Sequence, residues 1–324
     1  MAKKIEIISP YLLILFLCFL LIGFNFWTST VKAGDTSTTQ VIVGNATPVV
    51  SSVSFNEGDS VVLTENSTKT VTVRALITDS NGCEDIWNGG AEAMIYRSGA
   101  TASCSADLDD CYLLASCSTD SARNNCTGGA DTDLIMSCSV NLQYFVDPTD
   151  GTASSSGEQW YGAIRAWDLA GGDHIASNST QTTDVQLLRA LEASASVDFT
   201  TVAAGANTGA SPIEMGVRNT GNSGMDPLIS TSTGTGTLTC STAGTCGSST
   251  IADANQKYAS VSQDYSVDYN TALSGTNTQF NAETSKPLHS TYPVDDQIFW
   301  GLGVDAGQQP GTYTGTTYFT AAGD

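Results

Sequence analysis

The sequence predicts an all-β protein composed of two tandem β-sandwich domains, and three observations support this fold class. Short segments in which polar and apolar residues alternate recur along the chain, which is the pattern of strands buried on one face. Gly, Asn and Asp separate these segments, and they are the residues that turns require. Hydrophobic residues make up 40% of the chain and charged residues only 14%, a composition that excludes a disordered chain.

The first 33 residues have the features of a secretory signal peptide. Lys3 and Lys4 precede an apolar run over residues 11–27, and Val31 and Ala33 occupy positions −3 and −1 of a cleavage site after Ala33. The run is close to the lower length limit for spanning a membrane, so an uncleaved anchor is the alternative. We therefore predict a protein secreted to the cell surface or beyond, which contacts the membrane only through this segment. Residues 34–43 are interpreted as a polar linker.

The chain is strongly acidic, with a formal net charge of −21 at pH 7. Removal of residues 1–33 would leave 9 basic and 32 acidic residues, and the mature chain would be more acidic still. Such a surface repels phosphate backbones, so we predict no nucleic-acid partner. The same surface attracts divalent cations.

The first domain, residues 44–190, is predicted from a series of strand-like segments. The clearest alternates polar and apolar residues over 68–77, and a turn at 79–82 ends it. The other strands predicted in this domain cover residues 48–55, 60–63, 91–97, 134–146 and 159–167. No segment here has convincing amphipathic helical spacing, so the domain is predicted to be a β-sandwich.

Two motifs of this domain resemble Ig-like modules of bacterial cell-surface proteins. The first is Asp-Ser-Asn-Gly-x-x-Asp-Ile at residues 79–86, and the second is Trp-x-x-x-Ile-x-Ala-x-Asp-x-x-Gly-Gly at residues 160–172. In those modules an aromatic-led strand runs into an Asp-x-x-Gly turn near the end of the module. The resemblance covers residues 45–190. It implies an Ig-like fold with a spacer, display or adhesive role, and it implies no catalysis.

Eight cysteines follow the signal segment, and an even number in an exported chain predicts disulfides. Six lie in the first domain and two in the second: Cys83, Cys104, Cys111, Cys117, Cys126 and Cys138, then Cys240 and Cys246. The polar stretch at about 99–138 is too long for an ordinary loop, so we interpret it as a loop stapled by disulfides. The sequence leaves the pairing open. A zinc site is the less favoured alternative, because these cysteines include no Cys-x-x-Cys pair and no nearby histidine.

Acidic side chains gather in two predicted turns of the first domain. One turn holds Asp79, Asn81, Glu84 and Asp85, and the other holds Asp168 and Asp173. Oxygen ligands in turns between strands suit Ca²⁺, so Asp79, Asn81 and Asp85 are candidate calcium ligands. The alternative is that these side chains only hydrogen-bond the local backbone, which is the usual role of Asp and Asn in turns. No other cofactor is predicted.

Trp87 and Tyr112 are the candidate ligand-binding residues. Trp87 lies between Asp85 and Gly89, surroundings that favour exposure. Tyr112 begins a short apolar stretch inside the stapled loop, and functional residues concentrate on long loops held by rigid scaffolds. The alternative for Tyr112 is a small core beneath the loop. Trp160, at the start of a strand, is interpreted as a core residue.

The second domain, residues 191–324, is predicted to be another β-sandwich. Residues 184–193, the one segment with helical spacing, are interpreted as a closing strand that runs into it. Further strands are predicted over residues 196–200, 213–219, 227–230 and 258–261. Residues 297–304 and 312–320 are predicted to form a hairpin with paired aromatic side chains. This hairpin is similar to the last one of many envelope β-domains. It holds one Trp-x-Leu element of cell-wall-binding modules, at 300–302, without the usual second element.

The sequence carries no motif of a hydrolase, a metalloprotease or a phosphate-binding enzyme, so we expect no enzymatic activity. We predict a structural or display protein of the cell envelope. Its expected partners are other cell-surface proteins, glycans or further copies of itself. The alternative is an adhesin that binds glycan or protein through the stapled loop.

Overall fold

The computed structural model describes residues 37–323 apart from 102, 115–116, 124–125, 129, 178–182, 232–236, 243–244, 268, 270, 283 and 289–294, together with residues 11, 14, 15, 17 and 18. At residues 87–89, 114 and 295 the description covers the backbone alone. The chain divides into two units, Met1–Gly44 and Asn45–Asp324, and the strands of the described residues all lie in the second. In this part of the chain no helix combines the length and hydropathy of a membrane span.

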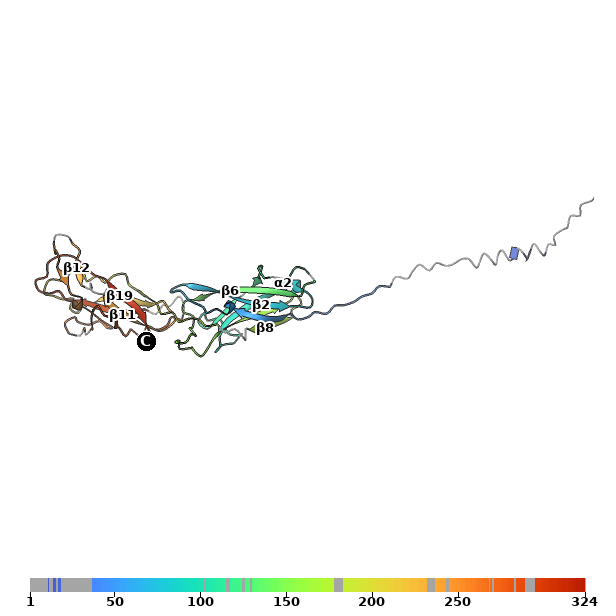
Figure 1. Cartoon of the computed structure of the whole chain (residues 1–324), viewed down its shortest axis with the longest axis horizontal. Helices are drawn as coiled ribbons and strands as arrows, with labels where there is room; N and C mark the ends of the chain where they lie inside the picture. Colours follow the sequence, from blue (N-terminus) through green and yellow to red (C-terminus); the bar gives the residue numbers. More distant parts are fainter. Residues whose placement is uncertain are drawn as a thin grey trace, which may run out of the picture. The chain divides into compact units, whose positions relative to one another are not determined.

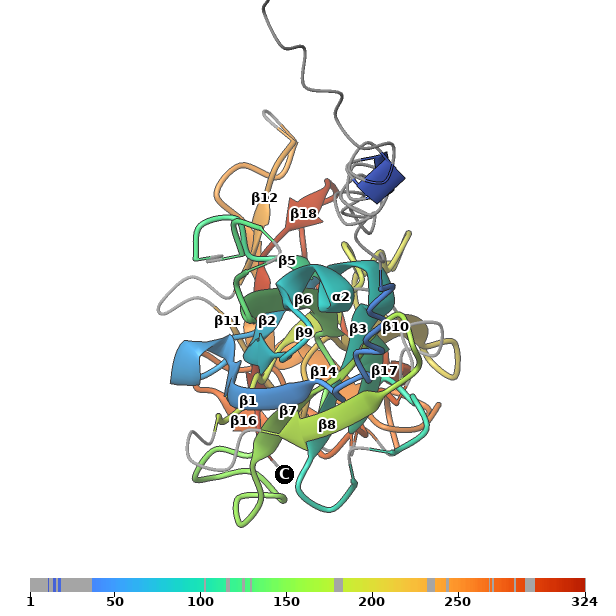
Figure 2. The ribbon, with the colours of Figure 1, turned by 90° about the vertical axis from the view of Figure 1, so that its right-hand side faces the viewer.

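Strands β1 to β8 form two antiparallel four-stranded sheets (Figure 1). The first sheet has the order β1 (Val49–Phe55), β2 (Thr68–Thr78), β6 (Asp133–Gln143), β5 (Ser118–Thr119). The second has the order β4 (Cys111–Leu114), β3 (Gly90–Arg97), β7 (Trp160–Trp167), β8 (Asp173–Ser177). The buried side chains of both sheets belong to one hydrophobic core, so the sheets pack face to face. Figure 2 shows the edge where β1 lies beside β8.

Strand β2 illustrates why these residues form a sandwich. Val71, Val73, Ala75 and Ile77 are buried, whereas the residues between them are partly exposed. The two-residue period of a strand therefore sends these four apolar side chains to the core, whereas Leu76 lies on the opposite face. β2 pairs with β1 on one side and with β6 along its whole length on the other, which makes it an inner strand of its sheet.

The predicted all-β sandwich fold is confirmed, and most predicted strands of the first domain are present. Strands β1, β2, β3, β6 and β7 correspond to the predicted segments 48–55, 68–77, 91–97, 134–146 and 159–167. Residues 60–63 differ, because Val61 makes only one parallel bridge, to Val185. A short helix, α2 (Cys83–Gly89), was not predicted. It buries Cys83 and Ile86 in the core, and seven residues are too few to display a helical repeat.

Strands β9 to β19 form three further antiparallel sheets. The five-stranded sheet has the order β15 (Thr271–Ala272), β14 (Gln256–Ala259), β17 (Asp295–Leu302), β10 (Ile213–Asn219), β9 (Leu191–Ala193). One three-stranded sheet has the order β16 (Thr278–Gln279), β11 (Asp226–Thr231), β19 (Thr317–Ala322). The other has the order β13 (Thr250–Ile251), β12 (Leu238–Cys240), β18 (Tyr313–Thr314). Short 3₁₀ turns occur at Asn56–Gly58 and Asp253–Asn255.

The predicted C-terminal hairpin is wrong, because its two halves lie in different sheets. β17 pairs with β10 and β14, whereas β19 pairs with β11 and β18 pairs with β12. The aromatic rings of Trp300 and Phe319 do meet, with centroids 6.3 Å apart and an angle of 76° between their planes. Their contact joins side chains of two sheets across a core instead of neighbouring strands of one sheet. The segment 196–200 also forms no strand.

The predicted closing strand, residues 184–193, divides between the two sets of sheets. Val185 bridges Val61, whereas Leu191–Ala193 forms β9 and pairs with β10. Leu188, between these two parts, is held by the buried side chain and backbone of Asn222. The Asn222 N–H donates to the Leu188 carbonyl (2.9 Å), and Asn222 Oδ1 accepts from the Leu188 N–H (2.6 Å). The domain limits and the Ig-like assignment stay predictions.

Candidate functional site

Three disulfides hold the cysteine-rich segment, residues 99–138. Cys83–Cys126 joins the start of α2 to the segment, Cys104–Cys111 closes a short loop before β4, and Cys117–Cys138 joins the approach to β5 with β6. The segment supplies β4 to one sheet and β5 to the other, at an edge of each. It therefore links the two sheets, and the predicted stapling of this loop by disulfides is confirmed.

Tyr112 is not an exposed contact residue, contrary to its candidate role. Its side chain is 2% exposed and belongs to the hydrophobic core. Its hydroxyl donates to the Leu108 carbonyl (2.6 Å) and accepts from the Gln143 N–H (3.1 Å), and burial raises its pKa. The neighbouring Leu113 points the other way and is 52% exposed. Alternation along β4 thus sends the tyrosine inward and the leucine outward.

Of the two tryptophans considered as contact residues, the structure describes the side chain of Trp160 alone. Trp87 lies in α2, and its side chain is outside the described residues. Trp160 is fully buried, and its indole N–H donates to the Asp147 carbonyl (2.9 Å). This is the core position predicted for it.

A network of charges lies beneath the cysteine-rich segment. Lys286 Nζ pairs with Asp109 and with Asp147 Oδ1 (2.6 Å), and it donates to the Phe145 carbonyl (2.9 Å). Arg97 Nη2 reaches the other oxygen of Asp147 (3.0 Å). Sequence reasoning missed this network, because Lys286 is 177 residues away from Asp109 in the chain.

Asp107 and Asp110 form a second pair of carboxyl groups in this segment. Burial raises the pKa of Asp107, but N–H groups of Asp109, Asp110 and Cys111 donate to its Oδ1 (3.0 Å each), and its pKa is lowered on balance. Burial, a hydrogen bond with Asp107 and the charge of Asp107 raise the pKa of Asp110 to about 6. Asp110 is therefore the more readily protonated carboxyl group of the pair.

Three carboxylates from separate elements meet at one end of the first sandwich. Asp79 follows β2, Asp85 lies in α2 and Asp168 follows β7. One oxygen from each lies within 4.8 Å of the other two. At an effective dielectric constant of about 20, two charges at such a distance repel by roughly 3 kcal/mol. We refer to Asp79, Asp85 and Asp168 as the carboxylate cluster.

All three members of the cluster accept hydrogen bonds, Asp85 Oδ1 from the Leu169 N–H (3.2 Å), yet one oxygen is left unsatisfied. Asp168 Oδ1 accepts from the Gly172 N–H (2.8 Å), and its Oδ2 accepts from the Asn45 amide (2.9 Å). Asp79 Oδ1 accepts from the Asn81 N–H (2.7 Å), but its Oδ2 is buried without a hydrogen-bond partner. Burial and the charges of Asp85 and Asp168 raise the pKa of Asp79, whereas the Asn45 hydrogen bond lowers that of Asp168.

The cluster differs from the predicted calcium ligands in one residue. Asp79 and Asp85 are brought together as expected, but the side-chain oxygen of Asn81 accepts from the Ala46 N–H (2.5 Å). Asp168, which the sequence places in a separate turn, takes the third position. Asp173 instead pairs with Arg165. The Asp-x-x-Gly turn at 168–171 was a signal for Asp168, since it marks the turn at the end of β7.

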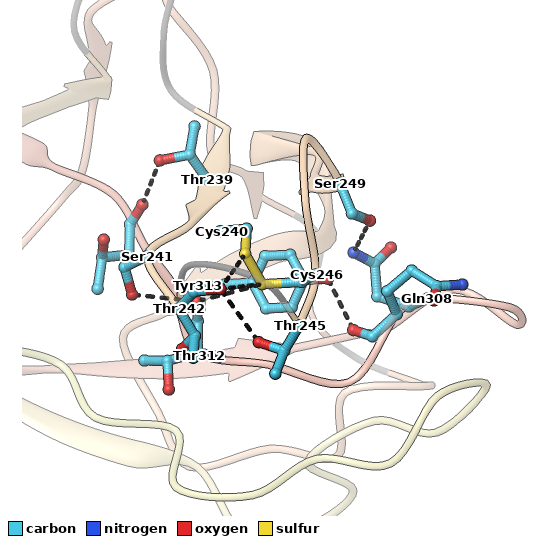
Figure 3. Close-up of a disulfide and its surroundings, with 12 residues drawn as sticks. Thr239, Cys240, Ser241, Thr242, Thr245, Cys246, Ser249, Gln308, Thr312 and Tyr313 are labelled. Atoms are coloured by element: carbon cyan, nitrogen blue, oxygen red, sulfur yellow. Dashed lines mark hydrogen bonds between the residues drawn. A yellow bond between two sulfur atoms is a disulfide. The ribbon is translucent and has the colours of Figure 1, made fainter.

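The fourth disulfide, Cys240–Cys246, closes a loop of threonines and serines after β12 (Figure 3). Thr245 Oγ1 donates to the Thr242 carbonyl (3.1 Å), and Thr242 Oγ1 accepts from the Thr312 N–H (3.1 Å). These contacts attach the loop to the chain leading into β18. Cys240 and Cys246 therefore pair with each other, and the loop that they close is a structural brace.

A shallow hollow lies over β1 and β2 beside the cysteine-rich segment. Its volume is about 250 Å³, and its lining includes Glu57, Arg74 and Arg123. Ion pairs already engage these charges, because both arginines contact Glu57 and Asp120. The hollow is smaller than ligand pockets usually are, at about 300–1,000 Å³.

Comparison with known proteins yields weak structural similarity and no sequence family. No protein-family model matches the chain, and no curated protein matches it. A similar solved structure is the CsuC-CsuE chaperone-tip adhesion subunit pre-assembly complex from archaic chaperone-usher Csu pili of Acinetobacter baumannii. The match has a TM-score of 0.33 and 11% sequence identity, and it covers 83% of this chain and 99% of that chain.

Proposed function

We propose that this chain is an exported structural or display protein of the cell envelope, without catalytic activity. The observation that carries the proposal is the state of the cysteines. Eight of the nine form four disulfides, and the remaining Cys18 lies in the apolar N-terminal segment that we propose is removed. Structural disulfides persist outside the cytoplasm, where thiols are not kept reduced.

The positions of the disulfides support a load-bearing or display role. Three of them hold the cysteine-rich segment to itself, to α2 and to β6 in the first sandwich, and the fourth braces a loop of the second set of sheets. A surface protein has to survive without chaperones, and cross-links limit the conformational freedom of its unfolded state.

A non-catalytic role is supported by the charged side chains of the described hollow and network, because ion pairs already engage them. The hollow over β1 and β2 is small, and its charged side chains are engaged in ion pairs. The buried charges beneath the cysteine-rich segment are likewise paired with Lys286 or Arg97. None of these groups forms a nucleophile with an adjacent base, which covalent catalysis requires.

Fractionation of the native host, followed by N-terminal sequencing and non-reducing mass spectrometry, tests the export proposal. We expect the protein in the medium or envelope, with Gly34 first and a mass that corresponds to four disulfides. Recovery from the cytoplasm with free thiols would contradict export. Recovery from membranes with Met1 intact would support the anchor alternative.

An adhesin is the second candidate function, and the exposed Leu113 on the cysteine-rich segment favours it. Leu113 lies on β4 beside the disulfides, so the contact it offers is held rigidly. We would compare the wild-type protein with Leu113→Ser and Trp87→Ala on a glycan array and measure self-association by light scattering. Specific binding lost in either variant supports the adhesin. Assembly without a ligand supports the structural role.

A further inference from the structure

We propose that Asp79, Asp85 and Asp168 form a calcium site that joins the two sheets of the first sandwich at one end. Asp79 follows β2 of one sheet, and Asp168 follows β7 of the other. Asp85 lies in α2, between β2 and β3. A cation bound to all three would connect both sheets and the helix.

The buried, unpartnered oxygen of Asp79 is the observation that points to a ligand. Asp79 is 1% exposed, and its Oδ2 has no hydrogen-bond partner. Buried polar atoms nearly always have a partner, so one without it requires an explanation. One oxygen of Asp85 and one of Asp168 lie within 4.8 Å of an oxygen of Asp79, and ionised carboxylates are acceptors that cannot satisfy it. A cation bound by the Asp79 carboxylate would supply the missing partner.

The cluster also lacks a compensating positive charge. The ion pairs of the described residues involve none of its three carboxylates. Asp79 and Asp168 are nonetheless almost fully buried. Buried charges are normally paired or bound to a metal, and among the described residues the Asn45 amide donates to Asp168 without supplying a positive charge.

The ligand type and the open side of the cluster suit Ca²⁺ better than Mg²⁺. Three oxygens within 4.8 Å of one another place a central ion at most roughly 2.8 Å from each, a distance compatible with the flexible 2.3–2.6 Å ligation of calcium. Mg²⁺ requires about 2.0–2.1 Å and near-ideal octahedral geometry. Asp85 is only partly buried, which leaves a side of the cluster open to the waters that complete calcium coordination.

Calcium titration of the purified, disulfide-bonded protein at constant ionic strength tests the proposal. After removal of divalent ions with a chelator, we expect calorimetry to show one Ca²⁺ bound per chain. At a concentration ten times the dissociation constant, binding would raise the ratio of folded to unfolded protein by about tenfold, and the melting temperature by a few degrees. We expect a smaller shift with Mg²⁺.

Variants separate this site from the general acidity of the chain. Asp79→Asn, Asp85→Asn and Asp168→Asn retain an acceptor oxygen but remove a charge, and each is expected to weaken calcium binding at least tenfold. Asp59→Asn, an exposed position with the same charge change, should bind as the wild type does. Asp85 is the least buried of the three ligands, so Asp85→Asn is expected to fold. It therefore tests the site even where a variant of Asp79 or Asp168 fails to fold. An absent calcium response, equal responses to Ca²⁺ and Mg²⁺, or unchanged binding by Asp85→Asn would overturn the site.

Discussion

The ammonium group of Lys286 lies 2.6 Å from Asp147 Oδ1 and also contacts Asp109 of the cysteine-rich segment. The lysine side chain is 16% exposed, so this is a largely buried ion pair. It connects the stretch between β16 and β17 with the first sandwich. Burial of Asp109 raises its pKa, while Lys286 opposes that change by favouring the charged form.

Replacement of Lys286 by Met is expected to lower the free energy of unfolding by about 2–3 kcal/mol, because it leaves Asp109 and Asp147 buried with less positive charge. Denaturation in urea measures the change. Lys69→Met is the matched control, since Lys69 is exposed and forms none of the ion pairs of the described residues. Asp109→Asn added to Lys286→Met should recover part of the loss in a double-mutant cycle. Equal losses in the two lysine variants would contradict the prediction.

The four disulfides are expected to contribute in the order of the loops they close. Their sequence separations are 43 for Cys83–Cys126, 21 for Cys117–Cys138, 7 for Cys104–Cys111 and 6 for Cys240–Cys246. The chain-entropy relation gives stabilisation of about 4, 3, 2 and 2 kcal/mol, respectively. Paired Cys→Ala substitutions, measured by denaturation in guanidinium, test this order. A larger loss at Cys240–Cys246 than at Cys83–Cys126 would refute it.

Strand positions could be predicted from this sequence, but strand partners could not. The alternation over 68–77 and 159–167 marks one buried face, and both segments are strands. The segments 297–304 and 312–320 show a similar pattern around a Gly-rich turn, yet β17 and β19 enter different sheets. Burial of alternate residues is a property of one segment, whereas pairing depends on the whole core that encloses Trp300 and Phe319.

Of the carboxylate cluster, only the two residues that are close together in the sequence were predicted as ligands. Asp79 and Asp85 belong to one turn and were found together, but Asp168 joins them only because β2 and β7 end at the same edge of the sandwich. The inward direction of Tyr112 depends on the register of β4, where a shift by one residue would reverse the two faces. Cysteine pairing is likewise a consequence of the folded chain, and composition alone predicted only that the cysteines pair.

The raised pKa of Asp110 predicts that stability declines as pH rises through about 4 to 6. In the folded protein, burial and Asp107 raise this pKa from 3.8 to about 6. The folded state therefore binds more protons than the unfolded state in this window, and unfolding becomes easier as pH increases. Each unit of pKa corresponds to about 1.4 kcal/mol, and the 30% exposure of the side chain reduces the effect.

Asp110→Asn should remove this decline. The amide preserves a donor toward Asp107 and carries no charge, so we expect a gain of about 1–2 kcal/mol at pH 7 and little change at pH 4. Urea denaturation at both pH values, with Asp59→Asn as a control of equal charge change, provides the measurement. A wild-type pH slope in Asp110→Asn would show that other groups cause the dependence.

Gly221 is a position where any side chain would collide with backbone. A Cβ atom placed there would lie 2.2 Å from the Leu188 carbonyl oxygen and 2.9 Å from the Ala190 nitrogen. The same turn supplies Thr220 N–H to the Ala190 carbonyl (3.1 Å) and Asn222 N–H to the Leu188 carbonyl (2.9 Å). A shift that accommodates the Cβ would therefore stretch the hydrogen bonds that hold residues 188–190.

Gly221→Ala is accordingly expected to lower the free energy of unfolding by about 3 kcal/mol, since overpacking alone costs about 1–3 kcal/mol and each lost hydrogen bond adds about 1 kcal/mol. Gly151→Ala is the matched control, because a Cβ there has no atom within 4 Å. Hydrogen exchange should show faster exchange at residues 186–190 in Gly221→Ala, while Gly151→Ala keeps the wild-type rates. Unchanged protection of Leu188 would mean that the turn tolerates the methyl group by moving elsewhere.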